Sequence, residues 1–231
     1  MSFIKVKNLK AGYDHNAILD GLNFEIAHGD FLGVVGPNGA GKSTLIKTLS
    51  TQIKPLDGEI FYAKTPIFCG YLAQHNLVST DFPASVSEVI SSGCLNTMGF
   101  FPFLRRKEQQ KVTEVMAFLG ILKLKNECYR NLSGGQQRLV LLGRALCASQ
   151  DLLILDEPNA GLDVNASNRL YDTIKRVNES LGLTIIMISH DFKVLNHCKH
   201  ILHLDHGQKF FGTFKEYVKT SVCTEFWGNK C

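Results

Sequence analysis

The sequence predicts an α/β protein whose core is a parallel sheet with helical crossover connections. Three observations support this class. The first is a set of short, continuous apolar runs, at residues 31–35, 152–155 and 183–188, which are typical of buried strands. The second is the helical pattern between the runs, because strands separated by helices form parallel sheets. The third is a glycine-rich turn that joins the first run to a helix.

The first 63 residues are predicted to form short strands with turns. Residues 22–27 alternate apolar and polar side chains, as a half-buried antiparallel strand does. A turn at residues 28–30 leads into the buried strand 31–35. After the glycines, residues 43–49 place apolar side chains at positions 45, 46 and 49, which is a helical spacing. The local order is therefore strand, glycine-rich loop, helix.

The middle of the chain, about 80–148, is predicted to be helical. Apolar residues occur there at helical spacing in three groups: Val86, Val89 and Ile90; Val115, Phe118, Leu119 and Leu122; Leu139, Leu142 and Leu146. Residues 99–103 contain three Phe and are expected to form a loop, either a contact surface or core filling. A further helix is expected over 166–180. We predict a single domain, with residues 1–79 and 149–231 forming the core and its β subdomain and about 80–148 forming an inserted helical subdomain.

The composition favours a globular protein. The 231 residues are 45% hydrophobic and 20% charged, which argues against disorder. Apolar runs stay well short of the roughly 18 residues that a membrane span needs. The first residues, 1–7, show no secretory leader, so a soluble intracellular chain is expected. The net charge of +4 is mild and the basic residues are interspersed with acids, which predicts no nucleic-acid partner.

Cysteine and histidine patterns give no metal assignment. The seven cysteines form no C-x-x-C pair, so reduced thiols are expected rather than a disulfide framework or a zinc ribbon. Four histidines fall within residues 197–206. A strand at this place would direct His200 and His203 to opposite faces, so surface and sheet-edge histidines are the preferred interpretation.

The strongest motif for chemistry is Gly36-Pro37-Asn38-Gly39-Ala40-Gly41-Lys42-Ser43, followed by Thr44. It matches the pattern G-x-x-x-x-G-K-[ST] at every fixed position and stands between a strand and a helix. Its glycines let backbone N–H groups surround phosphate oxygens at the positive end of a helix. Lys42 is predicted to reach the β- and γ-phosphates, and the Ser43 hydroxyl to ligate Mg²⁺.

A second motif is the acidic pair that ends an apolar strand, Asp156 and Glu157. Ligands of open α/β sheets bind at the carboxyl ends of strands. Asp156 is therefore predicted to hold the Mg²⁺ shell and Glu157 to polarise an attacking water. Acidic residues at strand ends also commonly cap the next helix. The pair therefore indicates a catalytic site only in combination with the phosphate-binding motif at 36–43. Together the two motifs still fit a GTPase, a kinase or a RecA-like motor.

The stretch Leu132-Ser133-Gly134-Gly135-Gln136-Gln137-Arg138 decides among these. With it, nearly the whole chain resembles the ATP-binding cassette (ABC) family, the ATPase subunits of ABC transporters. The resemblance implies an ABC cassette with a RecA-like parallel-sheet core, an N-terminal antiparallel β subdomain and an inserted helical subdomain. Physically, Ser133, Gly134, Gly135 and Gln136 form a second helix start able to bind phosphate.

The resemblance also implies roles for four more residues. Tyr13 fits the aromatic side chain that stacks on adenine, and Gln74 fits the glutamine that senses the metal beside the transporter contact. Asp163 lies in the D-loop, Asn159–Asp163, and His190 fits the histidine that contacts the γ-phosphate. The implied catalytic residues are thus Lys42, Gln74, Glu157 and His190. The implied Mg²⁺ ligands are Ser43, Gln74 and Asp156, with ATP as the nucleotide.

The resemblance further implies a head-to-tail homodimer. Each ATP would lie between the phosphate loop (residues 36–43) of one chain and the signature of the other, which acts in trans. The signature residues are Ser133, Gly134, Gly135 and Gln136. The sequence agrees, because its two phosphate-binding helix starts are about ninety residues apart. ATP binding would close the dimer and hydrolysis would release it. Expected partners are an integral membrane permease and, indirectly, a periplasmic or surface substrate-binding protein. The chain would then lie peripherally at the cytoplasmic face of the cell (inner) membrane.

Two segments resemble the zinc and manganese uptake ATPases within this family. They are residues 81–90, Asp81-Phe82-Pro83 and the seven that follow, and the strand at 200–207, which is nearer the zinc members. Siderophore and haem importers share part of this pattern. Two positions depart from the family: Gly93-Cys94 stands where the family often has Gly-Arg, and Asn159 replaces the commoner Thr or Ser of the D-loop. An importer of zinc or manganese is therefore expected. A siderophore or haem importer, or a soluble ABC ATPase acting on nucleic acid or ribosomes, is the alternative.

Overall fold

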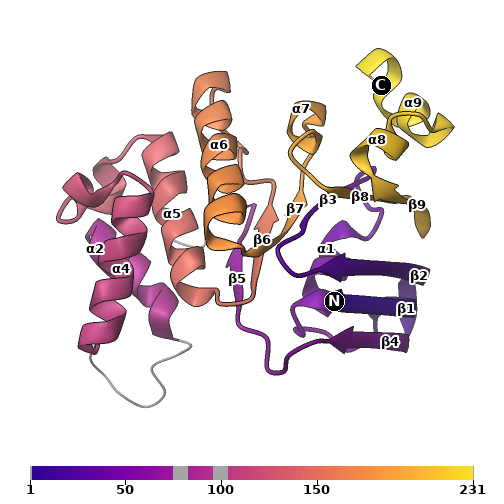
Figure 1. The fold of residues 1–231 in the computed structure, drawn as a ribbon, viewed down its shortest axis with the longest axis horizontal. Coiled ribbons are helices and arrows are strands. Elements are labelled where there is room, and N and C mark those ends of the chain that lie inside the picture. The colour runs from indigo at the N-terminus through magenta and orange to yellow at the C-terminus, as the bar shows by residue number, and fades with distance from the viewer. Residues whose placement is uncertain (1, 75–82, 96–103, 231) are drawn as a thin grey trace. The chain divides into compact units, whose positions relative to one another are not determined.

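The computed structural model describes residues 2–74, 83–95 and 104–230. It divides into two compact units, one formed by residues 1–67 and 178–231 and the other by residues 68–177 (Figure 1). The predicted limits of the helical subdomain, about 80–148, stay a prediction. In the described part of the chain, no helix combines the length and the apolar character that a membrane span requires.

The first unit contains the predicted antiparallel sheet at its amino-terminal end. Its strand order is β2-β1-β4, and both pairings with β1 are antiparallel. Along β2 the apolar side chains of Leu22, Phe24 and Ile26 are buried while those between them are exposed, as the alternating pattern predicted. The strands are β1 (Ser2–Tyr13), β2 (Asn16–Ala27) and β4 (Asp57–Tyr62).

The same unit contains the parallel strands that support the phosphate loop. β3 lies between β7 and β8 and runs parallel to both, whereas β9 is antiparallel to β8. Every residue of β3 and β7 is buried, which confirms the buried-strand prediction for both. The elements are β3 (Phe31–Val35), α1 (Lys42–Leu49), β7 (Thr184–Ile188), α7 (Phe192–Leu195), β8 (His200–Leu204) and β9 (Gln208–Thr213).

Short helices follow β9 at the carboxyl end, and Tyr217 of the first one packs against Phe210 of β9. They are α8 (Phe214–Tyr217), α9 (Ser221–Trp227) and the 3₁₀ turn η4 (Gly228–Lys230). The buried His203 bonds the Tyr217 hydroxyl at 2.7 Å, and burial lowers the pKa of His203 to about 4. His200 instead stacks on Phe211. Within the described ranges, no group of three or more His, Cys, Asp or Glu could hold a metal ion.

The cysteines differ in one respect from the expected set of reduced thiols. Among the described residues, Cys223 is disulfide-bonded, whereas the following cysteines form no disulfide: Cys69, Cys94, Cys128, Cys147 and Cys198. Cys223 lies in α9 with its side chain fully buried.

The second unit combines the parallel strands β5 and β6 with helices. β6 is buried throughout, as predicted. The elements are β5 (Cys69–Leu72), α2 (Val86–Ser91), η1 (Ser92–Cys94), α4 (Arg106–Phe118), η2 (Leu122–Leu124), η3 (Tyr129–Asn131), α5 (Gly134–Ala148), β6 (Leu152–Asp156) and α6 (Val164–Leu181), whose last residues belong to the first unit.

One helical face in this unit was predicted wrongly. Val112 and Met116 are the buried residues of α4, whereas Leu122 lies beyond the helix and is 41% exposed. The reason is Gly120, which has a left-handed φ of 71° and ends the helical stretch before Leu122. The phenylalanine-rich segment 99–103 lies outside the described residues.

Candidate functional site

The phosphate loop, residues 36–43, connects the buried end of β3 to the start of α1 in the first unit. Gly36 has φ 144°, and a Cβ added there would lie 2.0 Å from the carbonyl oxygen of Leu204. Gly41 is the N-cap of α1 with φ 91°, and it has no side chain to occupy the free N–H groups of the first turn. The loop therefore requires glycine at both positions, and its helix start remains open to an anion.

Lys42 is held inside this loop. Its side chain is buried, and Nζ donates to the carbonyl oxygens of Gly36 and Pro37, each at 2.8 Å. Ser43 is exposed at the first turn of α1, and Thr44 is buried beside it. The ammonium and the N–H groups at the helix start thus belong to one short segment, which is the arrangement that phosphate binding requires.

His190 and Tyr13 belong to the same unit. Val34 of β3 lies opposite Ile188 of β7 in parallel register, so both strands end at one edge of the sheet. His190 follows β7 at this edge and is exposed. Tyr13 ends β1 with 40% of its surface exposed, and Lys47 Nζ of α1 lies 5.6 Å from its ring centroid. The tyrosine ring is therefore positioned beside the helix that follows the phosphate loop.

In the second unit, the structure brings together three predicted residues. Asp156 is the last residue of β6, is nearly buried, and accepts a hydrogen bond from the Tyr71 hydroxyl at 3.1 Å. Burial, together with the charge of Asp156, raises the pKa of Tyr71. The next residue, Glu157, accepts a hydrogen bond at Oε2 from Gln74 Nε2 at 2.9 Å. The predicted water-polarising acid and the predicted glutamine are therefore in direct contact.

Glu157 has an unusual backbone conformation. Its φ is 44°, in the left-handed region, where a residue with a side chain is disfavoured by about 1–2 kcal/mol. Such conformations persist only where surrounding contacts hold them, and they are concentrated at functional sites. Glu157 shares this conformation with five other described residues that are not glycine, so the strain supports the motif-based assignment without replacing it.

The signature residues form the start of α5. Ser133 is the N-cap: its Oγ accepts from the N–H of Gln136, and its own N–H donates to Gln136 Oε1 at 2.9 Å. This reciprocal pair is a capping box. Gly134 and Gly135 follow without side chains, so their N–H groups are not covered by side chains of their own. The signature is consequently fixed in shape and is accessible from outside.

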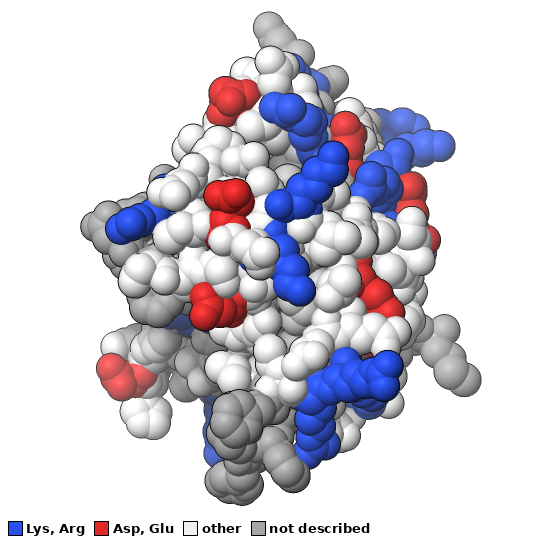
Figure 2. All heavy atoms as spheres, turned by 90° about the vertical axis from the view of Figure 1, so that its left-hand side faces the viewer, with Lys and Arg blue, Asp and Glu red and all other residues white. Residues whose placement is uncertain are grey.

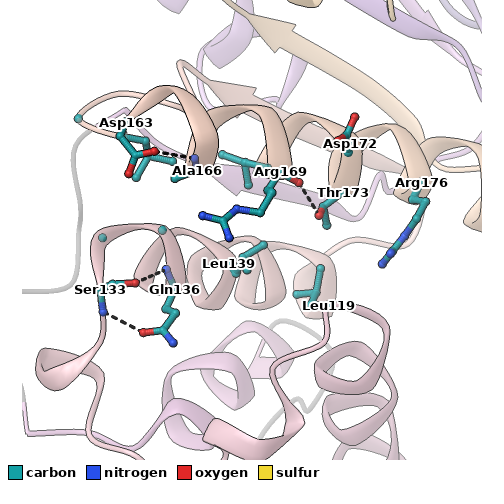
Figure 3. A pocket seen from close by; sticks show the side chains of 15 residues that line it. Leu119, Ser133, Gln136, Leu139, Asp163, Ala166, Arg169, Asp172, Thr173 and Arg176 are labelled. Carbon is teal, nitrogen blue, oxygen red and sulfur yellow. Dashed lines mark hydrogen bonds between the residues drawn. The ribbon is translucent and has the colours of Figure 1, made fainter.

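A second helix start lies next to it. Asp163 caps the beginning of α6 by accepting from the N–H of Ala166 at 2.9 Å. A cavity of about 660 Å³ lies along the two helices, and both begin at the same end of it (Figure 3). The start of α5 faces this cavity with a neutral cap and can attract an anion, whereas the start of α6 already holds the Asp163 carboxylate. Arg169 of α6 also points into this cavity.

Two residues beside the site were missed by the sequence analysis. Tyr71 contacts Asp156, as described above. Arg138 is buried on α5 and donates to backbone oxygens next to Gln74 and at Glu157. The sequence did contain a sign of this role. Arg138 stands four residues before Leu142 and eight before Leu146, so it lies on the same helix face as these buried leucines, where a charged side chain is unexpected.

The fold and these motifs define a nucleotide-binding ATPase of the cassette type. A scan against family models matches residues 19–160 to "ABC transporter". The chain therefore belongs to the ABC transporter family, as an ATP-binding ATPase.

Curated relatives and a solved structure extend the comparison. The zinc uptake system ATP-binding protein ZurA of Listeria monocytogenes is 32% identical over 223 residues, covering 93% of this chain and 87% of the relative. The zinc import ATP-binding protein ZnuC of Wolbachia from Brugia malayi is 34% identical over 206 residues, covering 89% and 80%. A Clostridium perfringens cassette that is part of an ABC transporter complex has a TM-score of 0.82 at 28% identity, covering 97% of this chain and 94% of the cassette.

Proposed function

We propose that the chain is the ATP-hydrolysing subunit of an importer that takes up a divalent metal ion, preferentially zinc, through a separate permease. The observation that carries the metal assignment is the similarity to two zinc-uptake ATPases over most of both chains. The sequence features at 81–90 and 200–207 agree with it. Asp81 and Phe82 lie outside the residues that the structure describes. The siderophore or haem importer is the alternative that shares part of the pattern.

The proposed reaction is the attack of water on the γ-phosphate of ATP. Lys42 and the loop N–H groups would neutralise the phosphates, and His190 would contact the γ-phosphate. Glu157 would accept a proton from the water, and Gln74, which touches Glu157, would orient this carboxylate. No covalent intermediate with the protein is needed, because positioning and charge neutralisation supply most of the rate increase in phosphoryl transfer.

The proposed metal set fits magnesium. Ser43, Gln74 and Asp156 offer hydroxyl, amide and carboxylate oxygens, which are the hard ligands that Mg²⁺ prefers. Asp156 has the buried position and the hydroxyl partner that fix a ligand's orientation. When bound with ATP, Mg²⁺ would draw negative charge from the β- and γ-phosphate oxygens.

The proposed working unit is a head-to-tail homodimer that docks on the permease. Each chain has two phosphate-binding helix starts, the phosphate loop at α1 and the signature at α5. Each nucleotide would be bound by the first of these from one chain and the second from the other. On the face shown in Figure 2, acidic side chains lie among the basic ones. This face therefore does not present the clustered cations that a nucleic-acid-binding surface would show.

The substrate is tested by uptake in a strain lacking the chain. We expect re-expression to restore accumulation of radioactive zinc, and growth in medium treated with a zinc chelator. The same gene carrying Lys42→Ala is the matched control and should restore neither. Manganese, haem and an iron siderophore are measured in parallel. Restoration of haem or siderophore uptake, with zinc uptake unchanged, would exclude the metal-ion assignment.

Adenine stacking on Tyr13 is tested by equilibrium titration with a fluorescent ATP analogue. Loss of the ring in Tyr13→Ala should weaken binding by about 5- to 100-fold, in line with the value of aromatic–base stacking elsewhere. Tyr13→Phe keeps the ring and is expected to bind as tightly as the parent. If Tyr13→Ala and Tyr13→Phe both bind the analogue as tightly as the parent, Tyr13 does not stack on the base.

A further inference from the structure

Arg138 is a charged residue in a position that the helix pattern assigns to the core. It lies on α5, five residues after the N-cap Ser133, and only 4% of its surface is exposed. A buried guanidinium is strongly destabilising unless its donors are satisfied. The contacts of Arg138 must therefore account for its place in the molecule.

The guanidinium donates to the backbone carbonyl oxygens of at least three described residues. Nη2 donates to Glu157 at 2.8 Å, Nε donates to Pro158, and Nη1 donates to Ala73 at 3.2 Å. The negative charge of Asp156 also acts on the group. These acceptors come from two separate segments, one that contains the hydrolytic carboxylate and one that ends immediately before Gln74. The planar fork of arginine can serve several acceptors at once in this way, whereas a lysine ammonium cannot.

The peptide that Arg138 binds is the strained one. Glu157 has its left-handed φ of 44°, and Arg138 holds the carbonyl groups of both residues 157 and 158. Gln74 further orients the Glu157 carboxylate through its hydrogen bond. Arg138 also donates to the carbonyl oxygen of Ala73, the residue before Gln74. One side chain thus fixes both partners of the Gln74–Glu157 contact through their backbones.

We propose that Arg138 is a positioning residue that sets the direction of the Glu157 carboxylate and links it to the signature helix. The proposal rests on the proposed hydrolytic role of Glu157. In the proposed dimer, the signature of each chain contacts the nucleotide bound to the partner's phosphate loop. Glu157 of the same chain acts instead on the nucleotide bound to its own phosphate loop. Arg138 would therefore transmit occupancy of one nucleotide site to the hydrolytic group of the other, within a single chain.

Kinetics of Arg138 variants of the full chain test the proposal. Arg138→Met should lower kcat for ATP about 100-fold, the loss expected from a small misplacement of a reacting group, with KM for ATP within about threefold of the parent. Arg138→Lys keeps the positive charge but not the planar, forked set of N–H donors, and its kcat should be about tenfold lower than that of the parent. Lys111→Met is the matched control: Lys111 Nζ donates to carbonyl groups of Cys147 and Ser149 at the other end of α5, and kcat should not change.

A double-mutant cycle with Glu157→Gln separates positioning from general destabilisation. If Arg138 acts through Glu157, adding Arg138→Met to Glu157→Gln should lower the residual hydrolysis by less than threefold rather than 100-fold. Multiplicative losses, parallel loss of ATP binding and melting temperature, or an unchanged kcat in Arg138→Met would each overturn the proposal. Parent-like hydrolysis by Glu157→Gln alone would instead overturn the proposed function, so the two failures are distinguishable.

Discussion

Glu157→Gln is expected to bind ATP about as well as the parent while hydrolysing it about 10²- to 10⁴-fold more slowly. The amide keeps the size of the carboxylate, and its oxygen can still accept the hydrogen bond from Gln74. It cannot take the proton of the attacking water. Because hydrolysis opens the proposed dimer, the variant should accumulate as an ATP-bound dimer. Phosphate release measures the first effect, and size-exclusion chromatography with and without ATP measures the second.

The control for this experiment is Glu114→Gln. Glu114 is an exposed glutamate of α4 that accepts a hydrogen bond from Gln110 Nε2 at 2.8 Å, so it matches the Gln74–Glu157 pair in type. Its substitution should leave both the rate and the dimer population unchanged. Hydrolysis at the parent rate by Glu157→Gln would assign the base to another group.

Mixing two inactive variants should restore activity. Lys42→Ala removes the ammonium of the phosphate loop, and Ser133→Asp places a negative charge where the signature meets phosphate. Each variant alone is expected to lose at least about 10²-fold in kcat. In a mixed dimer of twofold symmetry, one of the two nucleotide sites contains both intact halves. An equimolar mixture should therefore recover about a quarter of the parent rate per chain.

The choice of aspartate follows from the structure. Aspartate is a good N-cap, so Ser133→Asp preserves the start of α5 and changes the charge alone. Ser133→Asn, which also caps but is neutral, should lose less. Ser85→Asp makes the same substitution in the capping box of α2 and should hydrolyse normally. A mixture as inactive as its components would show that the signature does not act on the partner's nucleotide.

Much of the fold could be predicted because its main strands are buried along their whole length. The runs in β3, β6 and β7 contain no exposed residue, so their sequences show continuous apolar character that few other structures produce. The prediction of the buried face of α4 was wrong because the apolar spacing in the sequence continues past Gly120, where the backbone turns and the helix ends. The pattern records side-chain type, whereas the helix end depends on a backbone conformation available to glycine.

The site was predictable where chemistry depends on short spacing along the chain. The phosphate loop and the signature each lie within eight residues or fewer, so one motif contains the whole local geometry. Arg138 could not be assigned in this way. Its role depends on Ala73 and Pro158, which are distant in sequence, and on the left-handed conformation of Glu157. Contacts of this kind arise only when the second unit is folded.

The capped start of α5 has a chemical consequence for the two surfaces that would enclose each nucleotide, the signature of one chain and the phosphate loop of the other. The attraction that the signature offers to phosphate comes from peptide N–H groups and a hydroxyl, none of which changes charge near neutral pH. The phosphate loop, in contrast, adds the charge of Lys42, whose Nζ is held by the carbonyl oxygens of Gly36 and Pro37. One of the two surfaces that would enclose a nucleotide would therefore attract phosphate with a formal charge, and the other with neutral dipoles alone. Loss of the Lys42 charge in one chain would disable the ATP site formed on its own loop and leave its contribution to the partner's site intact.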